Sequence, residues 1–164
     1  MNLTKLNNLQ KTVLVIAGSD PSGGAGIQAD LKTLTSFGVY GMTAITALTE
    51  QNTNGVFDIL EIPIEFVVKQ INCCLSDINA NAVKIGMLHS ADLISAVLEA
   101  LLNNNIVSNK KVNIVLDPVM VAKGGHKLLK ENAIDALKNF IKVAQPILTP
   151  NIPEAEILTG IKIN

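Results

Sequence analysis

The sequence predicts an α/β fold in which helices cover both faces of a mostly parallel sheet. Short apolar, β-branched runs alternate along the chain with segments whose apolar residues recur at helical spacing, which is typical of a parallel sheet. The chain has 164 residues, 48% hydrophobic and 16% charged, so it can bury a substantial core and is not a disordered chain. We expect one domain over residues 1–164.

The first expected strand is followed by a loop and a helix. Residues 12–17 form a β-branched apolar run that ends at Gly18, which predicts a buried strand. Residues 19–26 are rich in glycine, serine and proline, which predicts a loop. The helix that follows has apolar residues at helical spacing and ends near Gly38. These apolar residues are Ile27, Leu31 and Leu34.

Two further strands and a second helix are expected next. Residues 39–48 mix β-branched and aromatic residues, and residues 56–62 alternate enough to form another strand. Pro63 suits the first turn of a helix, because its missing N–H would have no partner there. The apolar stripe of this helix consists of Ile64, Val67, Ile71 and Leu75.

The second half repeats the same alternation. Residues 82–88 and 111–116 predict buried strands, and Ser90 is placed to cap the helix between them. Leu93, Val97 and Leu101 share one face of that helix.

The last expected elements are a helix around residues 129–141, a strand at 146–149 and a helix that begins at Pro153. The chain ends at Asn164, just after a helix that should pack on a sheet edge. We therefore expect the fold to be truncated on its C-terminal side.

Composition excludes several classes of function. The formal net charge is −1, and all 13 basic residues are scattered lysines, so we expect neither a nucleic-acid nor a membrane partner. No apolar run approaches the ~18 residues of a membrane span. Cys73 and Cys74 are adjacent in an apolar stretch, which suits buried thiols in a reducing compartment and predicts a cytoplasmic location. His89 and His126 have no partner at metal-ligand spacing, so no zinc site is expected.

The glycine-rich loop after the first strand leaves three interpretations open. It is not a Walker A loop, because Gly24 and Ala25 stand where lysine and serine or threonine are needed. Gly24, Gly26 and Ala29 match a short dinucleotide-binding pattern, which is weak evidence alone. The glycines could instead let backbone approach a small flat ligand, with Asp30 facing the same cavity, or form a tight turn with no ligand.

Polar residues at the other strand ends suggest a ligand site, because these ends meet at one edge of a parallel sheet. The carboxamide of Gln51 offers a donor and an acceptor side by side, which matches an aminopyrimidine, although a loop glutamine can simply be solvated. Asp117, Asn151 and Glu154 supply the oxygen ligands that Mg²⁺ prefers. The competing interpretation is that Asn151 caps the last helix and Glu154 favours its positive end.

Five segments together carry motifs that are highly specific in this order: residues 15–32, 44–53, 84–88, 115–123 and 149–156. They closely resemble the hydroxymethylpyrimidine/phosphomethylpyrimidine kinases of thiamine biosynthesis. The resemblance implies a ribokinase-like fold and Mg²⁺- and ATP-dependent phosphorylation of 4-amino-5-hydroxymethyl-2-methylpyrimidine, then of its monophosphate. It assigns the pyrimidine pocket to Gly18, Ala25, Asp30, Gln51, Met87 and Val119. It also assigns Asn151 and Glu154 to Mg²⁺ and phosphate, and Asp117 to the region of the transferred group.

The same resemblance places the catalytic residues and most of the ATP pocket beyond Asn164, so we expect the chain to be inactive on its own. Lys123 and the metal are then the only cations expected near the site, and Gly124 to His126 depart from the family pattern in a flap segment. Two alternatives stay open: a pyridoxal or pyridoxine kinase, and a pyrimidine-binding module without catalysis. A homodimer is also open.

Overall fold

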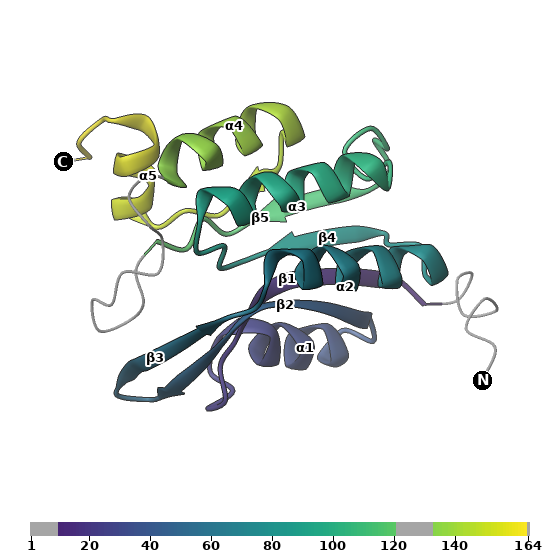
Figure 1. The fold of residues 1–164 in the computed structure, drawn as a ribbon, viewed down its shortest axis with the longest axis horizontal. Coiled ribbons are helices and arrows are strands. Elements are labelled where there is room, and N and C mark those ends of the chain that lie inside the picture. The colour runs from purple at the N-terminus through teal and green to yellow at the C-terminus, as the bar shows by residue number, and fades with distance from the viewer. Residues whose placement is uncertain (1–9, 121–132, 164) are drawn as a thin grey trace.

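A single six-stranded sheet organises the chain in the computed structural model, which describes residues 10–120 and 133–163 (Figure 1). The spatial order of the strands is β3-β2-β1-β4-β5-β6. Their bounds are β1 Thr12–Ser19, β2 Tyr40–Asn52, β3 Gly55–Glu61, β4 Ala82–Ile85, β5 Asn113–Leu116 and β6 Ile147–Leu148. All neighbouring pairs are parallel except β2 and β3, which form an antiparallel hairpin. The prediction of a mostly parallel sheet is confirmed.

Helices lie on both faces of the sheet, as predicted (Figure 1). The helix α1 packs on β1 and β2 from one side, whereas α2, α3 and α4 cover the other side. The described helices are α1 Gly26–Ser36, α2 Ile64–Asp77, α3 Ala91–Asn103, α4 Ile134–Ala144 and α5 Ile152–Thr159. None of these helices is both long and apolar enough to cross a membrane.

The alternation of side chains along each strand divides the core in two. On β1, Leu14 and Ile16 enter the large core beneath α2, α3 and α4, whereas Val15 and Ala17 pack with Ile27 of α1. All four of these strand residues are at most 1% exposed. A strand buried on both faces explains why residues 12–17 form an uninterrupted apolar run.

Two strand ends differ from the prediction, and both lie next to the candidate site. β2 continues to Asn52, because its end pairs with β3 across a short turn, so Gln51 lies on a strand and not in a loop. β4 ends at Ile85. Beyond it, the carbonyl of Met87 accepts a hydrogen bond from the buried Thr46 hydroxyl at 2.8 Å, which takes the place of strand pairing.

Helix boundaries follow the predicted signals in most places. The Ser90 side chain caps α3 by accepting a hydrogen bond from the Leu93 amide at 3.3 Å. The described part of α4 begins at Ile134, so residues 129–132 of the predicted helix lie outside the described residues.

The cysteine prediction is wrong for one of the two residues. Cys73 is exposed on α2 and Cys74 is partly buried. Burial raises the pKa of the Cys74 thiol, and the neighbouring Cys73 adds to that shift, so Cys74 is held in its less reactive protonated form.

Candidate functional site

A cavity of about 400 Å³ opens at the carboxyl-terminal edge of the sheet. Four segments that are far apart in the sequence form its wall: the loop after β1, the β2–β3 hairpin, the end of β4 and the segment after β5. Ligands bind at this edge of open parallel sheets, because strand ends and helix N-termini converge there. The cavity is therefore the candidate binding site.

Most of the sequence-predicted pocket residues lie on this cavity. Five of them line it: Gly18, Ala25, Gln51, Met87 and Val119. Asp117, which was assigned to the region of the transferred group, also lines it. Asp30 does not line the cavity but pairs with Lys84, which does. Asn151 and Glu154 are not among the lining residues.

The glycine-rich loop folds around the carboxylate of its own Asp20, which is 3% exposed. One carboxylate oxygen accepts hydrogen bonds from the amide and hydroxyl of Ser22, at 2.8 and 2.7 Å. The other accepts hydrogen bonds from the amides of Gly24 and Ala25, at 3.1 and 2.8 Å. Burial alone would raise the pKa of Asp20, but these hydrogen bonds outweigh it and hold the pKa below its ordinary value.

This arrangement disfavours the dinucleotide interpretation of the loop. In a dinucleotide site, amides at the start of the helix would bind pyrophosphate. Here the amides of Gly24 and Ala25 already donate to Asp20, an anion supplied by the protein itself.

Two glycines of the site lie at close contacts, and of the two only Gly26 has rigid backbone as its nearest neighbour. Gly26 has a positive φ of 57°, and a Cβ there would lie 2.4 Å from the Gly18 carbonyl oxygen. At Gly18, a Cβ would meet the Met87 Cε at 2.8 Å. The glycines thus allow α1 and Met87 to approach the end of β1 closely.

Gln51 is held by its neighbours at the mouth of the β2–β3 hairpin. The hairpin register shifts between Glu50 and Gln51, an irregularity that redirects the side chains that follow it. The Thr49 hydroxyl has one hydrogen, and it shares it between the Ser19 carbonyl at 2.7 Å and Gln51 Oε1 at 3.1 Å. One acceptor lone pair and the amide donors of Gln51 remain for a ligand.

The expectation that Lys123 and a metal are the only cations near the site is wrong, because Lys84 also lies there. Its side chain lines the cavity, and its ammonium pairs with Asp30 at 2.8 Å. Lys123 and the segment from Gly124 to His126 lie outside the described residues. Burial raises the pKa of the Asp117 carboxyl, the positive charge of Lys84 opposes that shift, and the negative charges of Glu154 and Asp30 add to it.

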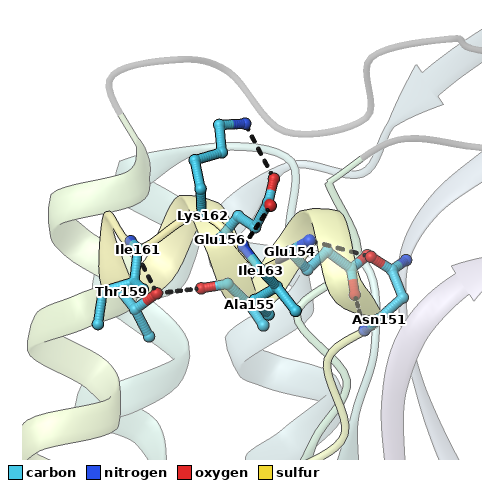
Figure 2. A network of polar contacts seen from close by, with 8 residues as sticks. All are labelled: Asn151, Glu154, Ala155, Glu156, Thr159, Ile161, Lys162 and Ile163. Carbon is cyan, nitrogen blue, oxygen red and sulfur yellow. Dashed lines mark hydrogen bonds and ion pairs between the residues drawn. The ribbon is translucent and has the colours of Figure 1, made fainter.

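Asn151 and Glu154 form a capping box at the start of α5, as Figure 2 shows. Asn151 Oδ1 accepts from the Glu154 amide at 3.0 Å, and Glu154 Oε2 accepts from the Asn151 amide at 2.9 Å. The capping interpretation of this pair is thus confirmed. Glu154 is 6% exposed, and its second oxygen, Oε1, accepts no hydrogen bond from any residue that the structure describes.

The donor set around Asp117 and Glu154 fits a hard divalent cation. Both supply carboxylate oxygens, and they are close enough for the charge of Glu154 to raise the pKa of Asp117. A cation near both would remove this repulsion. Within residues 10–120 and 133–163, no group of three or more His, Cys, Asp and Glu side chains is placed to hold a metal, so water or phosphate oxygens would have to complete the shell.

Sequence reasoning missed the roles of Lys84, Thr49 and Asp20. Lys84 interrupts an apolar strand, and this signal could have indicated a paired or functional charge. Asp20 followed by serine and two glycines is a pattern in which a carboxylate accepts from the amides that follow it. Thr49 carries no such local signal, because its partners are set by the hairpin.

Comparison with known proteins places the chain in a family. The phosphomethylpyrimidine kinase family model matches residues 20–164. The hydroxymethylpyrimidine/phosphomethylpyrimidine kinase of Haemophilus influenzae is 50% identical over 153 residues, covering 93% of this chain and 55% of the relative. The chain spans about half the length of the curated relatives it matches.

Solved structures agree with this assignment. A phosphomethylpyrimidine kinase crystal structure from Clostridium difficile matches with a TM-score of 0.84 and 48% identity, covering 94% of this chain and 65% of that one. Pyridoxal kinase from Staphylococcus aureus in complex with pyridoxal matches with a TM-score of 0.80 and 36% identity, covering 94% and 54%. The chain belongs to the hydroxymethylpyrimidine/phosphomethylpyrimidine kinase family and has the ribokinase-like α/β fold that the resemblance implied.

Proposed function

We propose that this chain supplies the pyrimidine pocket of a kinase that phosphorylates 4-amino-5-hydroxymethyl-2-methylpyrimidine, and then its monophosphate, with ATP. The observation that carries the proposal is the cavity of about 400 Å³, on whose wall Gly18, Gln51, Met87 and Val119 lie together. These residues come from four separate segments of the chain. A wall that combines apolar side chains with hydrogen-bonding groups suits a flat heteroaromatic ligand.

Gln51 would orient the ring. Thr49 contacts its carboxamide at Oε1, to which it donates a hydrogen that it shares with the Ser19 carbonyl. The remaining lone pair of Oε1 would accept from the exocyclic amine, and the amide would donate to the neighbouring ring nitrogen. Met87 and Val119 would contact the apolar faces of the ring.

Asp117, Asn151 and Glu154 would serve the phosphate side of the site. Glu154 keeps one carboxylate oxygen outside the capping box, and Asp117 lines the cavity. Both suit Mg²⁺, which on binding neutralises charge on the phosphates of ATP. Asn151 would act by holding Glu154 in place. Related pyridoxal kinases from Staphylococcus aureus have been solved with ADP and with AMP-PCP, which supports ATP as the donor.

Isothermal titration calorimetry with the pyrimidine alcohol tests the proposal. We expect the wild-type chain to bind it, and Gln51→Ala to weaken binding by about 1–3 kcal/mol because the paired hydrogen bonds are lost. Asn103→Ala, which removes an exposed carboxamide at the end of α3, is the control and should leave the affinity unchanged. Failure of the wild-type chain to bind, or equal affinity of Gln51→Ala, would reject the proposal.

A pyridoxal or pyridoxine kinase is the second candidate, and the fold match to pyridoxal kinase is the observation that favours it. The same calorimetry with pyridoxal separates the two, because the candidate substrate should bind more tightly. A coupled ATP-consumption assay of this chain tests catalysis. We expect binding without turnover, as in a non-catalytic pyrimidine-binding module.

Exposed apolar side chains on β3 and α2 suggest that the chain self-associates. Phe57 and Leu60 on the edge strand β3 are 60% and 64% exposed, and Phe66 nearby in sequence on α2 is 56% exposed. A second copy of the chain covering the exposed apolar side chains of β3 would form the homodimer. Light scattering should then give twice the chain mass, and Phe57→Asp should return it to the monomer mass.

A further inference from the structure

Lys84 occupies an unusual position for a charged side chain, an interior strand of the sheet. Its neighbours Val83 and Ile85 are fully buried in the large core, so Lys84 points to the opposite face. An ammonium at this depth needs an ionic partner or water, because burying it unpaired is costly. Asp30 on α1 is that partner, at 2.8 Å, and the two side chains remain 26% and 22% exposed.

The cavity beside Lys84 is otherwise negatively charged. Asp20 and Asp117 both line it, and Lys84 is the one basic side chain among the described residues of its wall. An ammonium has three N–H donors, and Asp30 takes one of them in the structure. Lys84 is also close enough to Asp117 to oppose the rise in its pKa. The positive charge of Lys84 therefore stabilises the negative charges of two carboxylates, Asp30 on α1 and Asp117 after β5.

Part of the usual alternative for binding an anion is occupied at this edge of the sheet. The start of a helix holds phosphate through its unpaired amides. In this chain the amides of Gly24 and Ala25, just before and at the cap of α1, donate to Asp20. The first-turn amides of α1 have no side-chain cap, but they carry no net charge, so among the described residues of the wall Lys84 is the cation that can neutralise an anionic ligand.

We propose that Lys84 binds the phosphate group of the phosphorylated pyrimidine, and so makes the cavity accept the monophosphate as well as the alcohol. This inference rests on the proposed function. The neutral alcohol needs no such cation, because its ring is recognised by Gln51 and the apolar wall. A phosphate dianion beside Asp117 does need one, because two like charges close together repel. Lys84 is thus a specificity-determining residue for the second substrate.

Calorimetry on the full chain with both ligands tests the inference. Lys84→Gln should weaken binding of the monophosphate by about tenfold or more, because a charge-assisted hydrogen bond is lost. The affinity for the alcohol should change by less than about threefold. Lys84→Arg keeps the charge and should retain most of the monophosphate affinity. Lys69→Gln, which removes an exposed lysine on α2, is the control and should change neither affinity.

A second pair of variants separates phosphate binding from support of the fold. Lys84→Gln leaves Asp30 without its ionic partner, so its fold could be disturbed. The double variant Asp30→Asn with Lys84→Gln removes both charges together, and it should show the same selective loss of the monophosphate. Asp30→Asn alone frees the ammonium and should bind the monophosphate at least as tightly as the wild type. Added salt should weaken binding of the monophosphate and not of the alcohol.

The outcomes distinguish failure of the pyrimidine pocket from failure of the phosphate-binding role of Lys84. If the wild-type chain binds neither ligand, the proposed function fails and this inference fails with it. If the wild type binds both and the double variant loses both equally, or loses neither, the proposed function stands and the role of Lys84 is overturned. Selective loss of the monophosphate supports both.

Discussion

Asp20 and Glu154 are two buried carboxylates that accept hydrogen bonds from backbone amides near the starts of two helices. Asp20 accepts amide hydrogen bonds just before α1, and Glu154 accepts one at the start of α5. They are 3% and 6% exposed. The difference lies in their second oxygens. Both oxygens of Asp20 are bonded within the loop, whereas Oε1 of Glu154 has no hydrogen bond to any described residue.

This difference separates a structural carboxylate from one that can still bind a ligand. Asp20 lines the cavity, yet its oxygens are occupied and its hydrogen bonds lower its pKa. Glu154 does not line the cavity, yet it keeps an oxygen and raises the pKa of Asp117. For these two carboxylates, the remaining hydrogen-bonding capacity of the side chain distinguishes them better than location on the cavity wall does.

The two helix starts also differ in backbone, and Gly26→Ala should have the largest effect on stability. The variant combines a strained positive φ with a Cβ only 2.4 Å from the Gly18 carbonyl oxygen. We expect the free energy of unfolding to fall by about 3 kcal/mol, measured by urea denaturation.

The matched control is Gly38→Ala, which has a positive φ but nothing within 4 Å. It should cost only about 1 kcal/mol, the strain of the left-handed backbone alone. Equal losses for Gly26→Ala and Gly38→Ala would mean that α1 does not pack on the end of β1 as closely as described.

Asp20→Asn should have the next largest effect. The variant loses the negative charge and turns an amide donor towards the amides of Gly24 and Ala25, which also donate. We expect a loss of about 2 kcal/mol in the free energy of unfolding. Asp77→Asn, at the exposed end of α2, should leave stability unchanged. A stable Asp20→Asn variant would contradict the structural role of this carboxylate.

The pH dependence of stability should report on the same carboxylate. The pKa of Asp20 is lower in the folded chain than its ordinary value of 3.8. Its contribution is therefore fully present above that ordinary value and is lost as the pH falls through the folded-state pKa. The difference in unfolding free energy between wild type and Asp20→Asn should stay constant from pH 7 to pH 5 and shrink below about pH 4. A difference that grew on acidification would have the wrong sign.

Substitutions of Asn151 and Glu154 at the start of α5 should lower the free energy of unfolding less than Asp20→Asn does, and by different amounts. Asn151→Ala removes the cap and should lower the free energy of unfolding by about 1 kcal/mol. Glu154→Gln keeps an oxygen to accept from the Asn151 amide, so stability should change by less than about 0.5 kcal/mol.

Removing the charge of Glu154 should nevertheless weaken Mg²⁺ binding, measured by calorimetry with Mg²⁺ alone. If Glu154→Gln binds Mg²⁺ like the wild type, the carboxylate serves only the capping box.

The sequence predicted those structural features that depend on neighbouring residues, such as helix caps and a buried strand. Ser90 and Asn151 cap their helices as their residue types indicate, and the apolar run of β1 is buried on both faces. The strand ends also predicted that Gln51 and Asp117 would lie on one cavity, but Asn151 and Glu154, at the last strand end, do not line it. Gln51 and Asp117 come together because parallel topology brings the carboxyl ends of strands to one edge.

Contacts between distant residues could not be predicted in the same way. Lys84 pairs with Asp30, which is 54 residues away, and the pair depends on the register between α1 and β4. The extension of β2 through Gln51 depends on the antiparallel partner β3. In both cases the energy comes from an interaction that no local segment contains.

The most direct test of the pyrimidine pocket is an NMR titration of the ¹⁵N-labelled chain with the pyrimidine alcohol. We predict that the amide signals of Gly18, Gln51 and Met87 shift together with one dissociation constant, and that the signal of Phe140, a core residue of α4, does not move. Shifts centred on other residues, or no shifts at saturating ligand, would contradict the claim that this cavity is a pyrimidine pocket.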